Sequence, residues 1–190
     1  YNFSGCAYLF KLIILTCRYI MNSKIYYALL MSTIISSCTN YQAESFSSNS
    51  IDVYAAESNI TNEISVASFS ANNPGQNSIF CRGISKSVYL PNKVSFVKYI
   101  EEALTETLIN AKRYSKNSKD QLRGKIELVD FNTTAGRWHI KGIFNINNSL
   151  PVAIDGKYDF PSAWDNDAAC QNAASALNQA VSHFIHDIIS

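Results

Sequence analysis

Three consecutive segments in the second half of the chain alternate apolar and polar residues with a period of two. These segments are Lys125–Phe131, Arg137–Ile146 and Val152–Phe160. Successive side chains of a strand point to opposite faces, so this alternation is typical of a sheet with one buried and one solvated face. Because the connecting segments are short enough for hairpins, we predict an antiparallel meander of three strands. The alternation in the first strand places Ile126 and Leu128 on one face and Val129 with Phe131 on the other.

Helical periodicity flanks the meander. Over residues 94–111 and 168–188, apolar side chains recur at spacings of three and four, which gathers them into one stripe per helix. The first stripe consists of Val97, Ile100, Leu104, Leu108 and Ala111, and the second of Cys170, Ala173, Ala174, Leu177, Val181, Phe184 and Ile188. Asn92 or Ser95 is expected to cap the first helix, and Asp165 or Asp167 the second.

An opening strand is expected over residues 78–90, broken or bulged at Gly83 and ended by Pro91. The predicted order of elements is therefore β-α-β-β-β-α. Two helices on one face of a mostly antiparallel sheet make a two-layer sandwich, and the predicted fold class is α+β.

A second constraint comes from Met21–Cys38, which reads MNSKIYYALLMSTIISSC. One cation, an apolar centre of about 7–15 residues and a closing run of small residues are typical of a secretory signal. A cysteine directly after two small residues makes the segment resemble a bacterial lipoprotein signal, in which Cys38 would be acylated and become the mature N-terminus. The alternatives are a core helix or a membrane span, but a span needs about 20 apolar residues and lysines and arginines interrupt these runs.

The expected domain organisation follows from that signal. Residues 1–37 comprise the signal and 20 residues upstream of Met21, which we interpret as read-through ahead of the initiator. Residues 38–77 are rich in Ser, Asn, Ala and Glu, so they are predicted to form a flexible tether in which Ile51–Tyr54 could pair as an edge strand. The breaker at Asn72–Gly75 marks the boundary of a domain over residues 78–190.

Charge and cysteine content restrict the function. Three of the 16 basic residues and none of the 15 acidic ones precede Cys38, so the mature chain has 13 cations against 15 anions, which disfavours nucleic-acid binding. No Lys/Arg cluster indicates electrostatic docking to a membrane, so the lipid would have to hold the protein there.

In an oxidising compartment the isolated pair Cys81 and Cys170 is predicted to form a disulfide, with two inert buried thiols or a reactive thiol as the alternatives.

Candidate chemical groups are few, and we predict no catalytic residue, no metal site and no cofactor. His183 and His186 lie three apart on a helix but lack a third ligand, so a metal site is disfavoured. The acids around Trp164 are interpreted as a solvated turn with a helix cap; they are Asp155, Asp159, Asp165 and Asp167. A basic row on the exposed sheet face is interpreted as cross-strand ion pairs, or alternatively as a docking surface for an anionic glycan or an envelope protein; it consists of Arg137, His139, Lys141 and Lys157.

The order of elements resembles small accessory lipoproteins of Gram-negative envelopes, namely the LptE and YajG groups and transport-auxiliary lipoproteins. The segments SVYLPNKVSFVKYIEEAL, LVDFNTTAGRWHI and DAACQNAASALNQAV resemble those of uncharacterised lipoproteins of gamma-proteobacteria. The resemblance covers residues 78–190 and includes no catalytic motif, and a likeness of fold cannot assign a role. From the signal, the tether and the missing catalytic grouping, we predict a non-enzymatic lipoprotein whose domain binds another envelope component. Thr39 after Cys38 would fit sorting to the outer membrane, with the protein facing the periplasm.

Two other functions stay open. One is the binding of a small ligand or lipid in a cleft between the helices and the sheet. The other is a hydrolase, which requires His139 and either Asp155 or Asp159 to converge in a pocket.

Overall fold

The structure of the protein, a computed structural model, describes residues 40–190. The predicted signal over residues 1–37 and the predicted acylation site Cys38 lie outside them. In chain order the elements are β1 (Tyr41–Gln42), α3 (Ser50–Asn59), β2 (Ser65–Val66), β3 (Ser70–Ala71), β4 (Ser78–Phe80), β5 (Ser87–Tyr89), a short 3-10 turn (Pro91–Lys93), α4 (Phe96–Asn110), β6 (Gln121–Asn132), β7 (Arg137–Ile146), β8 (Val152–Asp159) and α5 (Asn166–Ile189).

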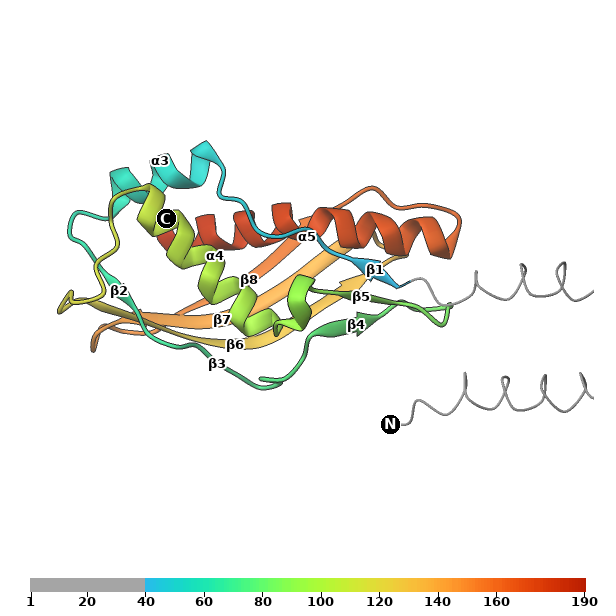
Figure 1. The fold of residues 1–190 in the computed structure, drawn as a ribbon, viewed down its shortest axis with the longest axis horizontal. Helices are drawn as coiled ribbons and strands as arrows, with labels where there is room; N and C mark the ends of the chain where they lie inside the picture. The colour runs from blue at the N-terminus through green and yellow to red at the C-terminus, as the bar shows by residue number, and fades with distance from the viewer. Residues whose placement is uncertain (1–39) are drawn as a thin grey trace, which may run out of the picture. The chain divides into compact units, whose positions relative to one another are not determined.

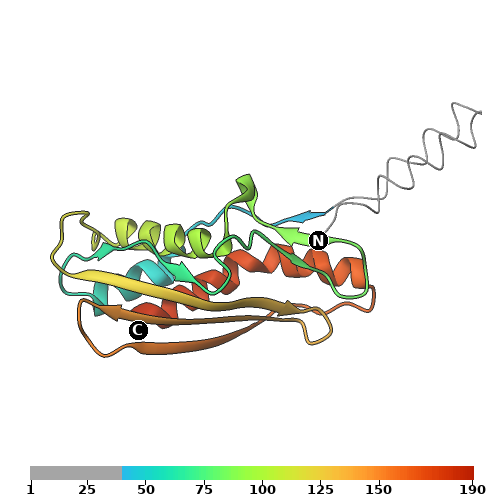
Figure 2. The ribbon, with the colours of Figure 1, turned by 90° about the horizontal axis from the view of Figure 1, so that it is seen from below.

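The predicted meander forms the main layer. Strands β6, β7 and β8 pair antiparallel in sequence order, and the short strands β2 and β3 add to the other edge of β6 in parallel. Helices α4 and α5 cover one face of this sheet, as Figure 1 and, from another side, Figure 2 show. The α+β class and the two-layer arrangement are therefore confirmed.

A β-bulge corrects the predicted faces of β6. The pairing of β6 with β7 shifts register between Ile126 and Leu128, so one extra residue, Glu127, is accommodated there. Such an insertion reverses the alternation beyond it. As a result, Ile126 before the bulge and Val129 and Phe131 after it are all buried against the helices, where strict alternation had placed them on opposite faces.

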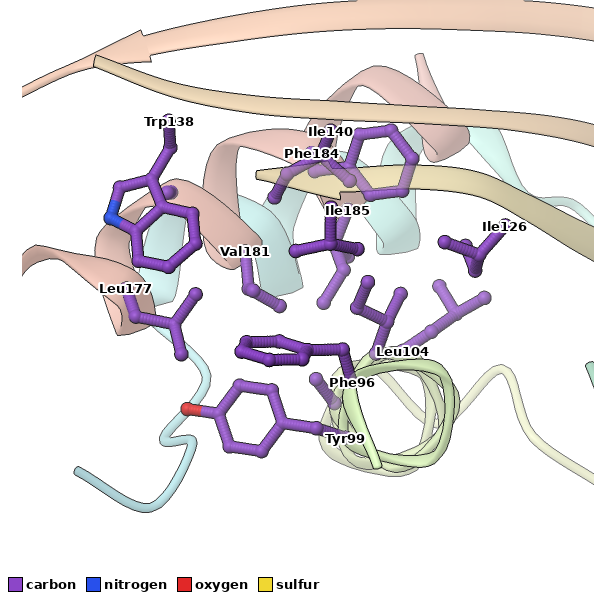
Figure 3. Close-up of a cluster of buried hydrophobic side chains, with 14 of the residues drawn as sticks. Phe96, Tyr99, Leu104, Ile126, Trp138, Ile140, Leu177, Val181, Phe184 and Ile185 are labelled. Carbon is purple, nitrogen blue, oxygen red and sulfur yellow. The ribbon is translucent and has the colours of Figure 1, made fainter. Parts of the chain in front are cut away.

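The core lies between the sheet and the two helices. Trp138 of β7 is fully buried, and its indole Nε1 donates a hydrogen bond of 2.9 Å to the carbonyl oxygen of Ala173 on α5. Figure 3 shows this ring beside Leu177 and Val181 of α5, with Phe96 of α4 facing them. Small alanines in the first half of α5 let the helix approach the sheet closely, so these aromatic side chains fill the layer interface.

The first predicted strand is only partly correct. Residues 78–90 form a hairpin of two short strands, β4 and β5, and the turn between them includes Gly83 at φ +83°. Together with β1, which pairs with β5 in parallel, this hairpin makes a separate three-stranded sheet. The expected break at Gly83 therefore ends one strand and begins another, because a left-handed residue there turns the chain back.

The predicted tether is wrong, because the folded unit begins at Asn40 and includes residues 40–77. Ile51–Tyr54 belong to the helix α3 rather than to an edge strand, and this helix is attached by polar contacts. Asn49 Nδ2 donates to Ser182 Oγ at 2.6 Å, the buried Asp52 carboxylate accepts from the same hydroxyl, and Asn59 Nδ2 donates to the carbonyl oxygen of Ile189 at 3.2 Å. The composition argument failed because these hydrogen bonds act together with scattered apolar residues of the segment, such as Ile64 and Phe69, which are buried in the core.

Candidate functional site

One end of the domain brings together the start of the folded chain, the turn between β4 and β5, and the loop before α5. We call it the disulfide end, because Cys81 directly after β4 and Cys170 in the second turn of α5 are joined there, with their Cα atoms 5.9 Å apart. Both cysteines are fully buried. The bond thus fixes the small sheet to the helix that covers the large one.

A polar clamp at the disulfide end holds β1. Lys86 Nζ lies 2.5 Å from Asp167 Oδ1 and 3.5 Å from the Tyr41 hydroxyl, and it sits 5.4 Å from the centre of the Tyr41 ring. Asn40 Oδ1 accepts a hydrogen bond of 3.1 Å from the Ser87 backbone N–H. The hydrogen bond from Lys86 lowers the pKa of Asp167, and the same contact raises the pKa of Lys86. The first described residues are therefore bound to the domain.

The disulfide end also exposes two aromatic side chains. Trp164 is fully exposed at 106% and Phe80 is exposed at 63%. Trp164 directly precedes Asp165, whose carboxylate caps α5 by accepting from the backbone N–H groups of Asp167 and Ala168. The predicted helix cap is confirmed, and Trp164 is the residue directly before it.

A hollow of about 370 Å³ adjoins Trp164. Its other lining residues are mostly small and polar, including Thr133 and Thr134 of the turn between β6 and β7 and Ser162 of the loop before α5. This turn therefore belongs to the disulfide end as well.

Three members of the basic row on the exposed sheet face form the predicted cross-strand ion pairs, whereas Lys157 forms none within residues 40–190. Arg137 Nε lies 2.5 Å from Asp159 Oδ1, while His139 Nε2 and Lys141 Nζ each lie 2.6 Å from the carboxylate of Asp155. Hydrogen bonds from Lys141 and then from His139 lower the pKa of Asp155, and the hydrogen bond from Arg137 lowers that of Asp159. These charges largely compensate one another, so the face offers no broad field for an anionic glycan.

The hydrolase hypothesis gains little from the meeting of His139 and Asp155. The side chain of Asp155 is 52% exposed and is shared with Lys141, so it belongs to an open surface network. A hollow of about 330 Å³ beside His139 is lined by Arg82, Arg137 and Lys157 among others. This arrangement supplies cations without a recognisable nucleophile and base pair.

His183 and His186 of α5 contact different side chains. The ring of His183 meets that of Tyr158 edge to face at 5.8 Å, whereas His186 Nδ1 lies 3.5 Å from the buried Asp52 carboxylate. Within residues 40–190, no group of three or more His, Cys, Asp or Glu side chains is arranged to hold a metal ion. Nδ1 of His186 makes no hydrogen bond within the described part of the chain, so this approach to Asp52 does not add to the hydrogen bonds that hold α3.

The opposite end of the domain exposes apolar side chains. We call it the distal end; it comprises α3, the last turn of α4 and the turn between β7 and β8. Its exposed large apolar residues are Ile51, Tyr54, Ile109, Ile146, Leu150 and Val152. All large apolar side chains exposed in residues 40–190 thus lie at one end or the other, while the long sides of the domain are polar or covered.

Two sequence comparisons return nothing: no protein-family model and no curated protein matches this chain. A solved structure does, the crystal structure of protein XCC0632 from Xanthomonas campestris, which is assigned to the family DUF330. The match has a TM-score of 0.50 at 13% identity and covers 80% of this chain and 92% of that chain. At this identity the likeness shows the fold alone. The α+β arrangement therefore also occurs in a bacterial protein of unknown function.

Proposed function

We propose that this protein is a lipid-anchored interaction module of the bacterial cell envelope, acylated at Cys38 and without enzymatic activity. The signal-like segment Met21–Cys38 motivates the anchor. The observation that carries the proposal is that the folded unit begins at Asn40, two residues after Cys38, and that its first strand is clamped by Lys86 and Asp167.

Such an anchor would set the orientation of the domain. Two extended residues span at most about 7 Å, so a lipid on Cys38 would keep the disulfide end at the membrane surface. The 24 residues of α5 run from the disulfide end to the distal end and cover about 36 Å at 1.5 Å per residue. The distal end would then be held roughly that far from the bilayer, where it can meet a partner protein.

The features of the distal end suit protein binding. Ile51 and Tyr54 of α3 are 68% and 71% exposed, and Leu150 at the tip of a hairpin is 87% exposed. Apolar side chains gathered at one end of a domain mark interaction sites more often than scattered ones do. We propose that another envelope protein docks here. We assign the protein to the outer membrane, facing the periplasm, from Thr39 after Cys38.

The disulfide fits the same location. Bonds between cysteines form and persist in oxidising compartments such as the periplasm. The alternative function, ligand binding in a cleft between helices and sheet, is less well supported because Trp138, Phe184 and their neighbours fill that interface. A hollow of about 200 Å³ beside Phe46 and Tyr99 is lined by α4 and by loops, and by no residue of β6, β7 or β8.

The anchor can be tested by mass spectrometry and membrane fractionation of native protein. The wild type should carry acyl chains on Cys38 and sediment with the outer membrane, whereas Cys38→Ala should lack the lipid and be released with the soluble fraction. The double variant Cys81→Ala/Cys170→Ala is the control, because it loses two sulfurs but keeps the acceptor. An unmodified Cys38 in wild-type protein, or membrane association that Cys38→Ala leaves unchanged, would refute the proposal.

A further inference from the structure

We propose that Trp164 and Phe80 insert into the interfacial layer of the membrane on which the protein is anchored. The inference rests on the proposed function, since it takes the lipid on Cys38 as the element that brings the disulfide end to the bilayer. It adds a second, aromatic point of contact to that anchor.

The position of Trp164 relative to the start of the chain supports this contact. Trp164 lies three residues before Asp167, whose carboxylate holds Lys86, and Lys86 in turn touches Tyr41. Phe80 adjoins Cys81, which is bonded to Cys170 of α5, the helix that also contains Asp167. Both aromatic residues therefore belong to the end from which the chain leads back to Cys38, and in Figure 1 the loop before α5, the turn between β4 and β5 and the start of β1 lie on the same side.

The exposure of Trp164 and its residue type favour a contact of its side chain with the membrane surface over exposure to water alone. Tryptophan is enriched at membrane surfaces, because its ring is apolar while its N–H can meet the polar headgroups. The other tryptophan of the chain, Trp138, is fully buried with its N–H bonded to a carbonyl oxygen. Trp164 is fully exposed, so its whole ring is free to enter an interface.

The charges of the disulfide end indicate which lipids matter. Lys86 is paired with Asp167, the exposed Arg82 lies 3.9 Å from Asp130, and Asp165 beside Trp164 adds a further anion, so this end has no excess of cations. Binding through anionic headgroups requires unpaired cations. The contact is therefore expected on zwitterionic bilayers and should change little with salt.

Depth-dependent quenching of tryptophan fluorescence tests the contact directly. The chain from Cys38 to Ser190 contains the folded unit with its own core and disulfide, and Cys38 is its one thiol outside that bond. It is coupled through Cys38 to maleimide lipids in phosphatidylcholine vesicles whose acyl chains are brominated. Trp164 should lose half or more of its emission relative to vesicles of unbrominated lipid, and its remaining emission should shift to shorter wavelength.

Two variants test whether the quenching comes from Trp164, and not from Trp138 or from any exposed tryptophan on the domain. In Trp164→Phe only the buried Trp138 emits, and bromination should leave its intensity unchanged. Adding Leu150→Trp to that variant places a tryptophan at another highly exposed position, in the turn between β7 and β8 at the distal end, and this ring should not be quenched.

The outcomes distinguish the contact from the anchor. Coupling holds the protein on the vesicle whether or not cells acylate Cys38, so an unmodified Cys38 in native material would refute the proposed function without touching this result. If Trp164 on coupled protein is not quenched, the membrane contact is overturned and Trp164 is left as a candidate for a protein interface. Equal quenching of Trp164 and of the tryptophan at position 150 would also overturn it, because the domain would then have no preferred end.

Discussion

Reduction of the disulfide between Cys81 and Cys170 should remove a large share of the stability of the domain. The bond closes a loop with a sequence separation of 89 residues. In the chain-entropy description, crosslinking a loop of that length lowers the entropy of the unfolded chain enough to stabilise the native state by about 4.6 kcal/mol at 25 °C. Since whole domains are stable by about 5–15 kcal/mol, the reduced protein is expected to be marginal.

Urea denaturation of the oxidised protein and of Cys81→Ala/Cys170→Ala measures this difference. The variant should unfold at a lower midpoint, with a loss of about 4–5 kcal/mol in the free energy of unfolding. Its unfolded chain is no longer held in a loop and exposes more surface, so the slope of that free energy against urea should rise. Cys38→Ala is the matched control, because it removes a sulfur outside the loop and should leave both quantities unchanged.

The reasoning is refuted if the oxidised and variant proteins differ by less than about 1 kcal/mol with equal slopes, since loop closure would then contribute little. A free-thiol titration of protein isolated under oxidising conditions provides an independent check. Two titratable groups in the chain from Thr39 onward would mean that the bond does not form.

Three further predictions concern the attachment of α3 and the polar contacts of α5. Asp52→Ala should cost about 2–4 kcal/mol, because it leaves the buried Ser182 hydroxyl without its carboxylate acceptor, and hydrogen exchange over α3 should accelerate, whereas Glu57→Ala on the exposed side should change neither. Tyr158→Phe should cost about 1.5–3 kcal/mol in urea denaturation by removing the hydrogen bond of 2.6 Å to the Asp187 carboxylate, while Tyr54→Phe, an exposed control, should be neutral. Because Lys86 lowers the pKa of Asp167, the stabilisation from this pair is present above the unfolded pKa of about 3.9 and is lost as the pH falls through the lower folded value. Thermal melts between neutral and strongly acidic pH should show that loss in the wild type and a shallower one in Lys86→Gln.

The elements that could be predicted are those whose signal is local. The strand β7 has the bounds predicted for it, Arg137–Ile146, because its buried and exposed residues alternate without interruption. The helix α4 begins at Phe96 after the expected cap Ser95, whose hydroxyl accepts from the Lys98 N–H at 3.4 Å. In both cases pattern and packing agree, so the local prediction and the tertiary structure coincide.

The helix α3 escaped prediction because its apolar residues do not gather into one stripe. Ile51 and Tyr54 face solvent, Val53 packs against the core, and the buried residues of the helix are Asp52 and two alanines. The periodicity that identifies a docked helix is therefore missing. The usable signal was the cap, since Asn49 accepts from the N–H of Asp52 three residues later.

The candidate site was predictable only in its covalent part. Counting cysteines was enough to pair Cys81 with Cys170, because no other cysteine follows Cys38. The clamp between Lys86 and Asp167 joins residues 81 apart, and it depends on how the β4–β5 hairpin meets the start of α5. The sequence predicts only a solvated turn around Trp164. The exposure of its ring indicates a contact surface only once the structure shows to which end of the domain it belongs.

The loss of the predicted tether changes what an anchor on Cys38 would do. A flexible tether over residues 38–77 would have a root-mean-square length of about 35 Å, so the domain could present any face to the membrane and to its partners. Since the described fold includes residues 40–77, an acylated Cys38 would stand two residues, at most about 7 Å, from the first described residue. Under the proposed anchoring, the disulfide end would therefore rest on the bilayer and the distal end would face away from it. Replacing the clamp residue Lys86 would restore some of that freedom, whereas lengthening the chain between Cys38 and Asn40 would restore nearly all of it.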